Sequence, residues 1–243
     1  MSKDVYVLAE QRDGNIQKVA FELVGEATKL AKDLNEQVVA ILLGDGVTAK
    51  AEELIQHGAD KVIVVDDPML AKYATEPYAK AITAIIKEFD PEIVLYGATS
   101  IGRDLAPRVS ARVHTGLTAD CTKLEIAEDT KLLNMTRPAF GGNIMATIVC
   151  KNHRPQMATV RPGVMAALAA DTARKGEVVP FKVEFTPADM NIEIIEEVKE
   201  TKKIVDVTEA KVLVSGGRGI GSPEFFNTLK ELADLLGLSL IHI

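Results

Sequence analysis

The sequence lacks the features that mark several large classes of protein. It has no tryptophan, only two cysteines (Cys121 and Cys150) in 243 residues, and 5% aromatic side chains. Two cysteines are too few for a disulfide framework or a cysteine-ligated zinc site. No hydrophobic run approaches the roughly 20 residues that cross a bilayer, and the N-terminus has no signal-peptide body. These absences predict a cytoplasmic protein with no membrane-inserted segment.

The charge balance and the missing motifs exclude further functions. The chain carries 28 Lys and Arg residues against 35 Asp and Glu residues, a net charge of −7. A net acidic chain is a poor candidate for binding nucleic acid, because affinity for phosphates needs clustered cations. The four histidines have no partners at metal-ligand spacing, and neither a hydrolase nucleophile elbow nor a zinc-protease motif is present. The sequence therefore does not predict catalytic side chains.

The N-terminal part alternates between two kinds of hydrophobic pattern. Short apolar runs are separated by segments in which apolar residues recur at helical spacing. The runs are residues 5–8, 38–43, 62–65 and 93–96. Strands that alternate with helices across short joints form a parallel sheet with right-handed crossovers. The pattern predicts an α/β fold with a Rossmann-like parallel sheet and helices on both faces.

After His114 the pattern becomes rich in β-strand signals. Residues 132–137 and 143–149 flank Gly141-Gly142 and indicate a β-hairpin. Residues 156–161 are expected to form another strand. This β-rich extension either lengthens the main sheet or forms a smaller sheet beside it.

The C-terminal part starts a new α/β unit. We expect an N-terminal domain at 1–192, a charged linker at 193–207 and the start of a second domain at 208–243. The second domain begins with a strand that ends at Ser215 and a helix that starts at Ser222, where Ser and Pro favour a helix N-terminus. One strand and one helix cannot complete a parallel sheet. We therefore expect this domain to be incomplete and the chain to be a fragment.

Two glycine-rich turns are candidate ligand-binding motifs. Residues 97–104 have the glycine spacing of a phosphate-binding loop but lack its Lys and Ser/Thr. Their alternative interpretation is a strand-to-helix turn whose Arg103 and Asp104 make surface or interface pairs. Residues 216–219, Gly-Gly-Arg-Gly, place one cation among glycines that let a ligand approach the backbone. The alternative there is a sharp turn with a solvated Arg218.

Two segments together resemble the α subunit of electron transfer flavoprotein, in the form found in anaerobic bacteria. They are residues 97–121, from Gly-Ala-Thr-Ser-Ile-Gly-Arg-Asp to Thr-Ala-Asp-Cys, and residues 214–219 with the following helix to Asp234. The resemblance implies an electron carrier that pairs with a β subunit, binds FAD and exchanges electrons with an acyl-CoA dehydrogenase or NADH. It places Arg218 against the flavin ring, with Gly216, Gly217 and Gly219 permitting the approach.

The resemblance also implies a longer protein. Family members continue past Gly237 with segments that supply most FAD contacts, and residues 238–243 depart from the family pattern. We therefore expect the 243-residue chain to retain little or no FAD. The sequence leaves open whether Arg108 or Arg137 reaches a flavin at a subunit interface.

Two other functions remain compatible with the residues. One is an adenine-nucleotide-binding regulatory module without redox activity, with residues 44–46 and 97–102 as its nucleotide loops. The other is a structural subunit whose N-terminal domain exists to bind its partner.

Overall fold

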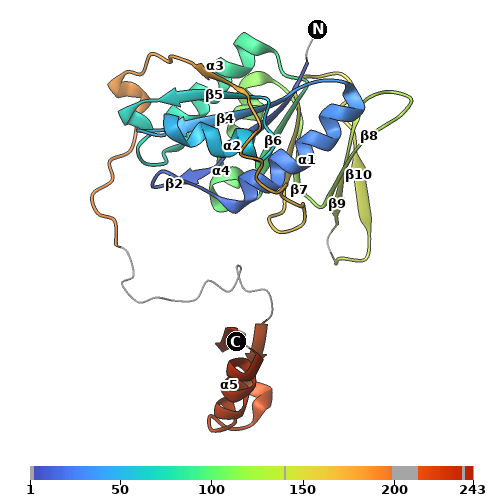
Figure 1. Cartoon of the computed structure of the whole chain (residues 1–243), viewed down its shortest axis with the longest axis vertical. Helices are drawn as coiled ribbons and strands as arrows, with labels where there is room; N and C mark the ends of the chain where they lie inside the picture. Colours follow the sequence, from blue (N-terminus) through green and yellow to red (C-terminus); the bar gives the residue numbers. More distant parts are fainter. Residues whose placement is uncertain (1–2, 140, 199–212, 237–238, 243) are drawn as a thin grey trace. The chain divides into compact units, whose positions relative to one another are not determined.

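The computed structural model describes residues 3–139, 141–198, 213–236 and 239–242. The chain divides into two compact units, Met1–Glu193 and Ile194–Ile243, and Figure 1 labels many of their helices and strands. Within the described ranges, no helix combines the length and the hydrophobicity needed to cross a membrane.

The larger unit is built on a parallel sheet of seven strands. Their order is β12-β5-β4-β1-β6-β11-β7, and every pairing is parallel. The strands are β1 (Val5–Ala9), β4 (Val38–Gly44), β5 (Lys61–Asp66), β6 (Ile93–Gly97), β7 (Leu117–Cys121), β11 (Gln156–Val160) and β12 (Glu177–Pro180). Strands β1, β4, β6 and β11 are buried along their whole length, as expected for the centre of a parallel sheet. The predicted parallel sheet is confirmed.

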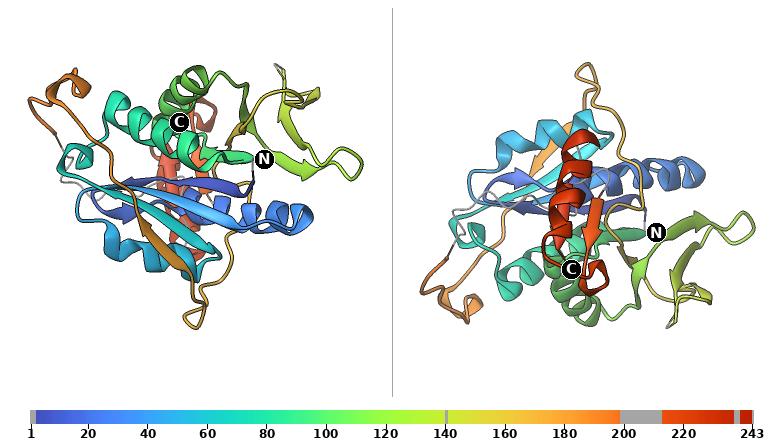
Figure 2. Two further views of the ribbon diagram at one scale, coloured as in Figure 1. Left: turned by 90° about the horizontal axis from the view of Figure 1, so that it is seen from above. Right: turned by 90° about the horizontal axis from the view of Figure 1, so that it is seen from below.

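Helices cover both faces of this sheet, as Figure 2 shows. They are α1 (Lys18–Leu34), α2 (Ala51–Gln56), α3 (Thr75–Phe89) and α4 (Ser100–Val113). Side chains alternate between the two faces along each strand: Val5 and Val7 pack in the core with α1 and α2, whereas Tyr6 packs in the core with α3 and α4. The predicted helices on both faces are therefore confirmed.

The strand order reverses between β1 and β6. The chain runs from β1 outward to β4 and β5, and then returns to form β6 on the other side of β1. In open α/β sheets, ligands bind beyond the carboxyl ends of the strands at such a switch point. The residues that follow β1 and β6 therefore lie where a nucleotide would be expected.

The β-rich extension both lengthens the main sheet and forms a smaller sheet, the two possibilities that the sequence left open. Strand β11 joins the main sheet between β6 and β7, whereas β8 (Lys123–Ile126), β9 (Leu133–Pro138) and β10 (Met145–Ile148) form a separate antiparallel sheet. A short ribbon of β2 (Gln11–Arg12) and β3 (Asn15–Ile16), which no hydrophobic pattern predicts, follows β1.

The segment after β12, at the end of the larger unit, is bound to α3 through Lys80. Beyond β12, Lys80 Nζ donates hydrogen bonds to Glu184 O at 2.7 Å and Asp189 Oδ2 at 2.8 Å, and it lies 5.9 Å from the centre of the Phe185 ring. Asp189 also accepts hydrogen bonds from the Thr186 amide and hydroxyl, within the short helix η3 (Pro187–Asp189). Lys80 thus holds the last segment of the larger unit in place.

Replacing Lys80 with Met is expected to free residues 181–190 without unfolding the unit. Met keeps the aliphatic stem but removes the ammonium group, and a partly exposed ion pair contributes only about 0–1 kcal/mol. Limited proteolysis should cut this segment faster, with little change in Tm. Lys87→Met, on the exposed side of the same helix, is the control. Equal cleavage rates in the two variants would contradict the role given to Lys80.

The ion pair between Lys80 and Asp189 should also persist at acidic pH. The hydrogen bond from Lys80, with those from Thr186, lowers the pKa of Asp189 to about 2. A carboxyl group with a lowered pKa stabilises the fold above its unfolded-state pKa and loses that contribution as the pH falls through its folded-state pKa. Residues 181–190 should therefore remain bound to Lys80 at neutral and mildly acidic pH.

The smaller unit is a strand-helix-strand element. Strand β13 (Leu213–Gly216) pairs in parallel with β14 (Ser239–His242), and α5 (Phe225–Leu236) connects them after the short helix η4 (Arg218–Ile220). The expectation of one strand and one helix was therefore wrong, because residues 239–242 add a second strand.

The boundaries of this unit also differ in detail from those predicted. Helix α5 begins at Phe225 rather than at Ser222, whose carbonyl accepts from the Phe225 amide at 3.3 Å in a preceding turn. Of the expected charged linker, residues 193–198 have no regular structure, and the rest lies outside the described residues.

Candidate functional site

The predicted glycine turn follows β13 in the smaller unit. Gly216, the last residue of β13, is buried. A Cβ atom there would lie 2.6 Å from Leu229 Cδ1 and 3.2 Å from Ile220 Cγ2. Glycine at this position therefore lets α5 pack closely against the strand, a packing that strand-turn-helix dinucleotide sites also need.

The turn opens into a hollow of about 690 Å³, a size that accommodates part or all of a cofactor. Arg218, at the start of η4, is exposed. Among the described residues that line the hollow (Gly217, Arg218, Ile220, Gly221, Ser222, Pro223 and Phe226), Arg218 is the one cation. A mostly apolar wall with one cation suits a flat aromatic ligand that has an electron-rich edge.

The structure brings only some of the predicted site residues together. Gly217 and Arg218 line the hollow, whereas Gly216 packs against α5 and Gly219 lies outside the lining. A Cβ at Gly219 would meet no atom of the described residues within 4 Å, so their packing does not require a glycine there.

Phe226 is a site residue that the sequence reading missed. Phe225, the first residue of α5, is 50% exposed, whereas Phe226 lines the hollow. Phe225 and Phe226 are equally hydrophobic, so the sequence pattern does not distinguish them. Which of the two lines the hollow depends on the residue at which α5 begins.

At the switch point of the larger unit, the chain supplies its own anion. Glu10, which follows β1, is 6% exposed. Its carboxylate accepts a hydrogen bond from Thr99 Oγ1 at 2.5 Å and pairs with Arg12 Nη2 at 3.0 Å. Thr99 Oγ1 in turn accepts from the Gly102 amide at the start of α4. The positive end of this helix, where a phosphate would bind, therefore already faces a carboxylate through Thr99.

In the second expected nucleotide loop, residues 44–46, a carboxylate of the chain also accepts the hydrogen bonds of the loop. Asp66, at the end of β5, accepts hydrogen bonds from the Gly46 amide at 2.6 Å, the Thr48 amide at 3.0 Å and the Thr48 hydroxyl at 2.5 Å. Partial burial alone would raise the pKa of Asp66, but these hydrogen bonds together lower it, so the group is a carboxylate at neutral pH.

A small cavity lies beside these two loops. The cavity there measures about 10 Å³, which is space for one water molecule at most. Its walls include Glu10, Gln11, Tyr73 and Tyr78. The structure of the larger unit therefore gives no support to the regulatory nucleotide-binding module.

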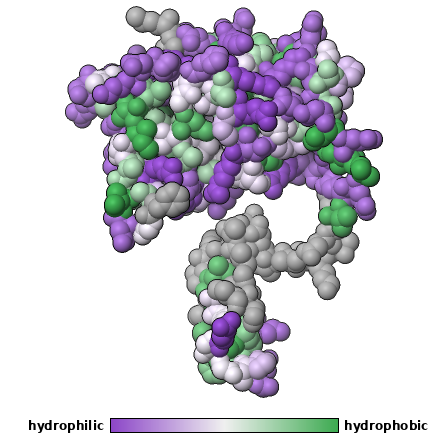
Figure 3. All heavy atoms as spheres, turned by 180° about the vertical axis from the view of Figure 1, so that it is seen from behind, coloured by the Kyte–Doolittle hydropathy of each residue, from purple (hydrophilic) through white to green (hydrophobic). Residues whose placement is uncertain are grey.

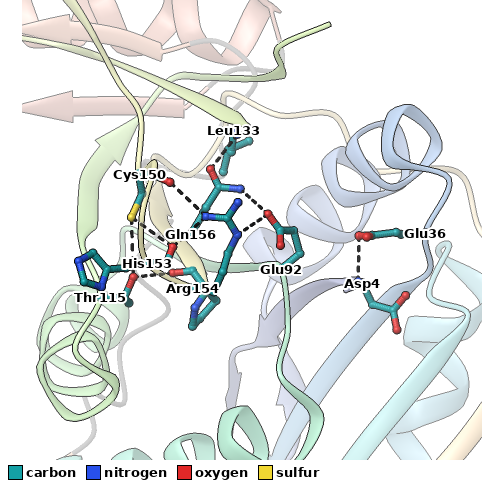
Figure 4. Close-up of polar contacts among 10 residues, drawn as sticks. Asp4, Glu36, Glu92, Thr115, Leu133, Cys150, His153, Arg154 and Gln156 are labelled. Carbon is teal, nitrogen blue, oxygen red and sulfur yellow. Dashed lines mark hydrogen bonds and ion pairs between the residues drawn. The ribbon is translucent and has the colours of Figure 1, made fainter. Parts of the chain in front are cut away.

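A further polar cluster lies at the opposite, amino-terminal edge of the sheet, as Figure 4 shows. Glu92 accepts from Arg154 Nε at 2.6 Å and from Gln156 Nε2 at 3.0 Å. Gln156 Oε1 accepts from the Leu133 amide at 2.9 Å, which ties β11 to the antiparallel sheet. Because these groups satisfy one another, the cluster is structural.

The remaining candidates for chemistry also have structural roles. Burial raises the pKa of the Cys121 thiol to about 12, so it is not a nucleophile at neutral pH. Arg108, on α4, pairs with Glu76 on α3 at 2.6 Å. In the described part of the chain, no group of three His, Cys, Asp or Glu side chains could hold a metal ion.

Comparison with known proteins identifies what this chain resembles. Residues 5–186 match the electron transfer flavoprotein domain. The chain is 54% identical to the electron transfer flavoprotein subunit alpha of Thermoanaerobacterium thermosaccharolyticum, over 97% of this chain and 71% of that protein. It is 50% identical to the subunit alpha of Clostridium acetobutylicum, over 97% and 70%. It is 47% identical to the acryloyl-CoA reductase electron transfer subunit beta of Anaerotignum propionicum, over 90% and 66%.

Proposed function

Because the chain belongs to the electron transfer flavoprotein family and matches its α subunits, we propose that it holds FAD at the turn after β13. Members of this family are flavoproteins that carry electrons rather than catalyse a reaction of their own, and the α subunit works in a heterodimer with a β subunit. Bound FAD would accept electrons and pass them on.

The hollow beside Gly217 and Arg218 is the observation that supports this proposal. It lies where β13 leads into α5, the position at which Rossmann-like units bind dinucleotides. The exposed guanidinium of Arg218 would interact more strongly with an anionic reduced flavin than with the neutral oxidised ring, and so would raise the reduction potential. Ile220 and Phe226 supply the apolar wall for the ring.

We further propose that the electron donor is an acyl-CoA dehydrogenase or NADH, and that the protein works in the cytoplasm. Support for the first comes from the similarity to a protein named as an electron transfer subunit of acryloyl-CoA reductase.

A titration that compares FAD with ATP tests the proposal. FAD added to the heterodimer of this chain and the β subunit is expected to bind, seen as a change in flavin fluorescence, and ATP is expected not to compete. Binding should be weak, because the hollow is open and has one cation in its lining. Purified chain should therefore be colourless after desalting. Tight binding of ATP without binding of FAD would contradict the proposal.

A further inference from the structure

A second concentration of positive charge lies on the larger unit, away from the proposed flavin site. Asp120, at the end of β7, accepts from Arg161 Nε at 3.1 Å and Arg161 Nη2 at 2.6 Å. Arg103 Nη2 lies 3.9 Å from the same carboxylate. The hydrogen bond from Arg161, together with the charges of Arg161, Arg103 and Arg137, lowers the pKa of Asp120. We call these four residues the Asp120 cluster.

The Asp120 cluster carries more positive charge than its own carboxylate can balance. Arg161, just after β11, and Arg103, on α4, both pair with the Asp120 carboxylate, and the charge of Arg137, on β9, also acts on it, so three guanidinium groups and one carboxylate give a local charge of about +2. The Arg103 and Arg161 side chains are 63% and 44% exposed, and ion pairs this exposed add little to stability. In a chain whose net charge is −7, such a patch is positioned to attract an acidic surface.

An apolar edge strand borders the Asp120 cluster. Arg137 lies opposite Ala146 in the antiparallel pairing of β9 and β10. Residues 144, 146 and 148 therefore share the face of Arg137. Ile144 is 65% exposed and Ile148 is 40% exposed. On its other side, β10 pairs with no described strand.

Several large hydrophobic side chains of the larger unit are exposed, among them Ile144, Met145 and Ile148 on and beside β10. On the face drawn in Figure 3, hydrophobic surface occurs as small patches within a mainly hydrophilic surface. An unpaired edge strand with large exposed apolar side chains is a surface that proteins normally cover.

We propose that the Asp120 cluster and strand β10 form one docking surface for the β subunit, which would place carboxylate side chains on the arginines and apolar side chains on Ile144 and Ile148. Apolar contacts at the centre with charged pairs beside them are the usual composition of a protein interface, and arginine is favoured there because its planar fork binds a carboxylate at two points. The inference rests on the heterodimer of the proposed function.

The charge of the surface argues against a second copy of this chain as the occupant. A symmetric dimer places the same patch of both subunits in one interface. Two Asp120 clusters would then face each other with about +2 each, and like charges in an interface oppose binding. A partner with acidic side chains has no such cost.

Affinity measurements on the heterodimer test the inference. Arg103→Gln/Arg161→Gln and Ile148→Ser should each weaken binding of the β subunit about tenfold or more, because truncation at the centre of an interface has large effects. The arginine variant should also make binding less sensitive to salt. Arg108→Gln and Val178→Ser are matched controls, since the Arg108 side chain is 52% exposed and Val178 is 40% exposed on β12, at the far edge of the main sheet.

Hydrogen exchange gives a second measurement that needs no substitution. Amides of β10 should exchange more slowly in the heterodimer than in the free chain, while those of β12 should not change. Unchanged exchange in β10, or variants that bind within twofold of wild type, would overturn the inference while leaving FAD binding and the heterodimer intact. Self-association that the same variants abolish would overturn it too. If wild-type chain fails to bind the β subunit at all, the proposed function fails first and this inference with it.

Discussion

Replacing Gly102 with Ala is expected to destabilise the larger unit strongly. Gly102 lies in the first turn of α4, and a Cβ atom there would overlap the carbonyl oxygen of Gly97 at the end of β6. The obstructing atom belongs to the backbone of a tight turn, so it cannot rotate away as a side chain could. Overpacking against backbone at a buried site should cost about 3 kcal/mol or more of unfolding free energy, measured by urea denaturation followed by circular dichroism.

Gly116→Ala is the matched control for this substitution. A Cβ atom there would lie 3.8 Å from Cys150 Sγ, an ordinary van der Waals contact. The expected change is within about 0.5 kcal/mol. If the two alanine variants were equally stable, the close approach of α4 to β6 would not be what requires glycine at position 102.

Replacing Arg218 with Gln is expected to lower the reduction potential of bound FAD. Gln retains hydrogen-bonding groups but carries no charge, so the reduced anionic flavin loses a stabilising cation. A charge-assisted hydrogen bond contributes about 1.5–3 kcal/mol, which corresponds to a drop of roughly 30–60 mV for a two-electron couple. The measurement is a redox titration of the heterodimer with excess FAD present, so that weak binding does not limit it.

Lys230→Gln, on the exposed side of α5, removes the same charge from the same unit without touching the lining of the hollow. Its potential should match that of wild type. A Lys230→Gln variant with the larger drop, or an Arg218→Gln variant with none, would show that the turn after β13 does not tune the flavin.

The hydrophobic pattern predicted the central strands and helices well, because each of them buries a regular stripe of side chains. It could not assign β11 to a place between β6 and β7, since strand order depends on contacts between residues far apart in the chain. The edge strand β12 and the terminal β14 were missed for a related reason. Strand β12 is mostly exposed, so it carries little periodic signal, and β14 is only four residues long.

The candidate sites also differ in whether their residues are adjacent in the sequence or come from distant elements. The turn around Arg218 was predictable because its glycines and its arginine are adjacent in sequence. The Asp120 cluster was not, because Arg103, Arg137 and Arg161 come from separate elements with no characteristic spacing. The paired carboxylate of Glu10 could not be predicted either, since nothing in the sequence around it indicates contact with Thr99.

The carboxylates of Glu10 and Asp66 have a consequence for regulation. A ligand that binds only the folded state stabilises it by mass action. The stability of such a protein therefore depends on the concentration of its ligand. The larger unit supplies the hydrogen-bond acceptors for both loops from its own side chains. Its melting temperature should therefore be the same in energy-rich and energy-depleted cells, and the amount of folded carrier would not rise and fall with the adenylate pool.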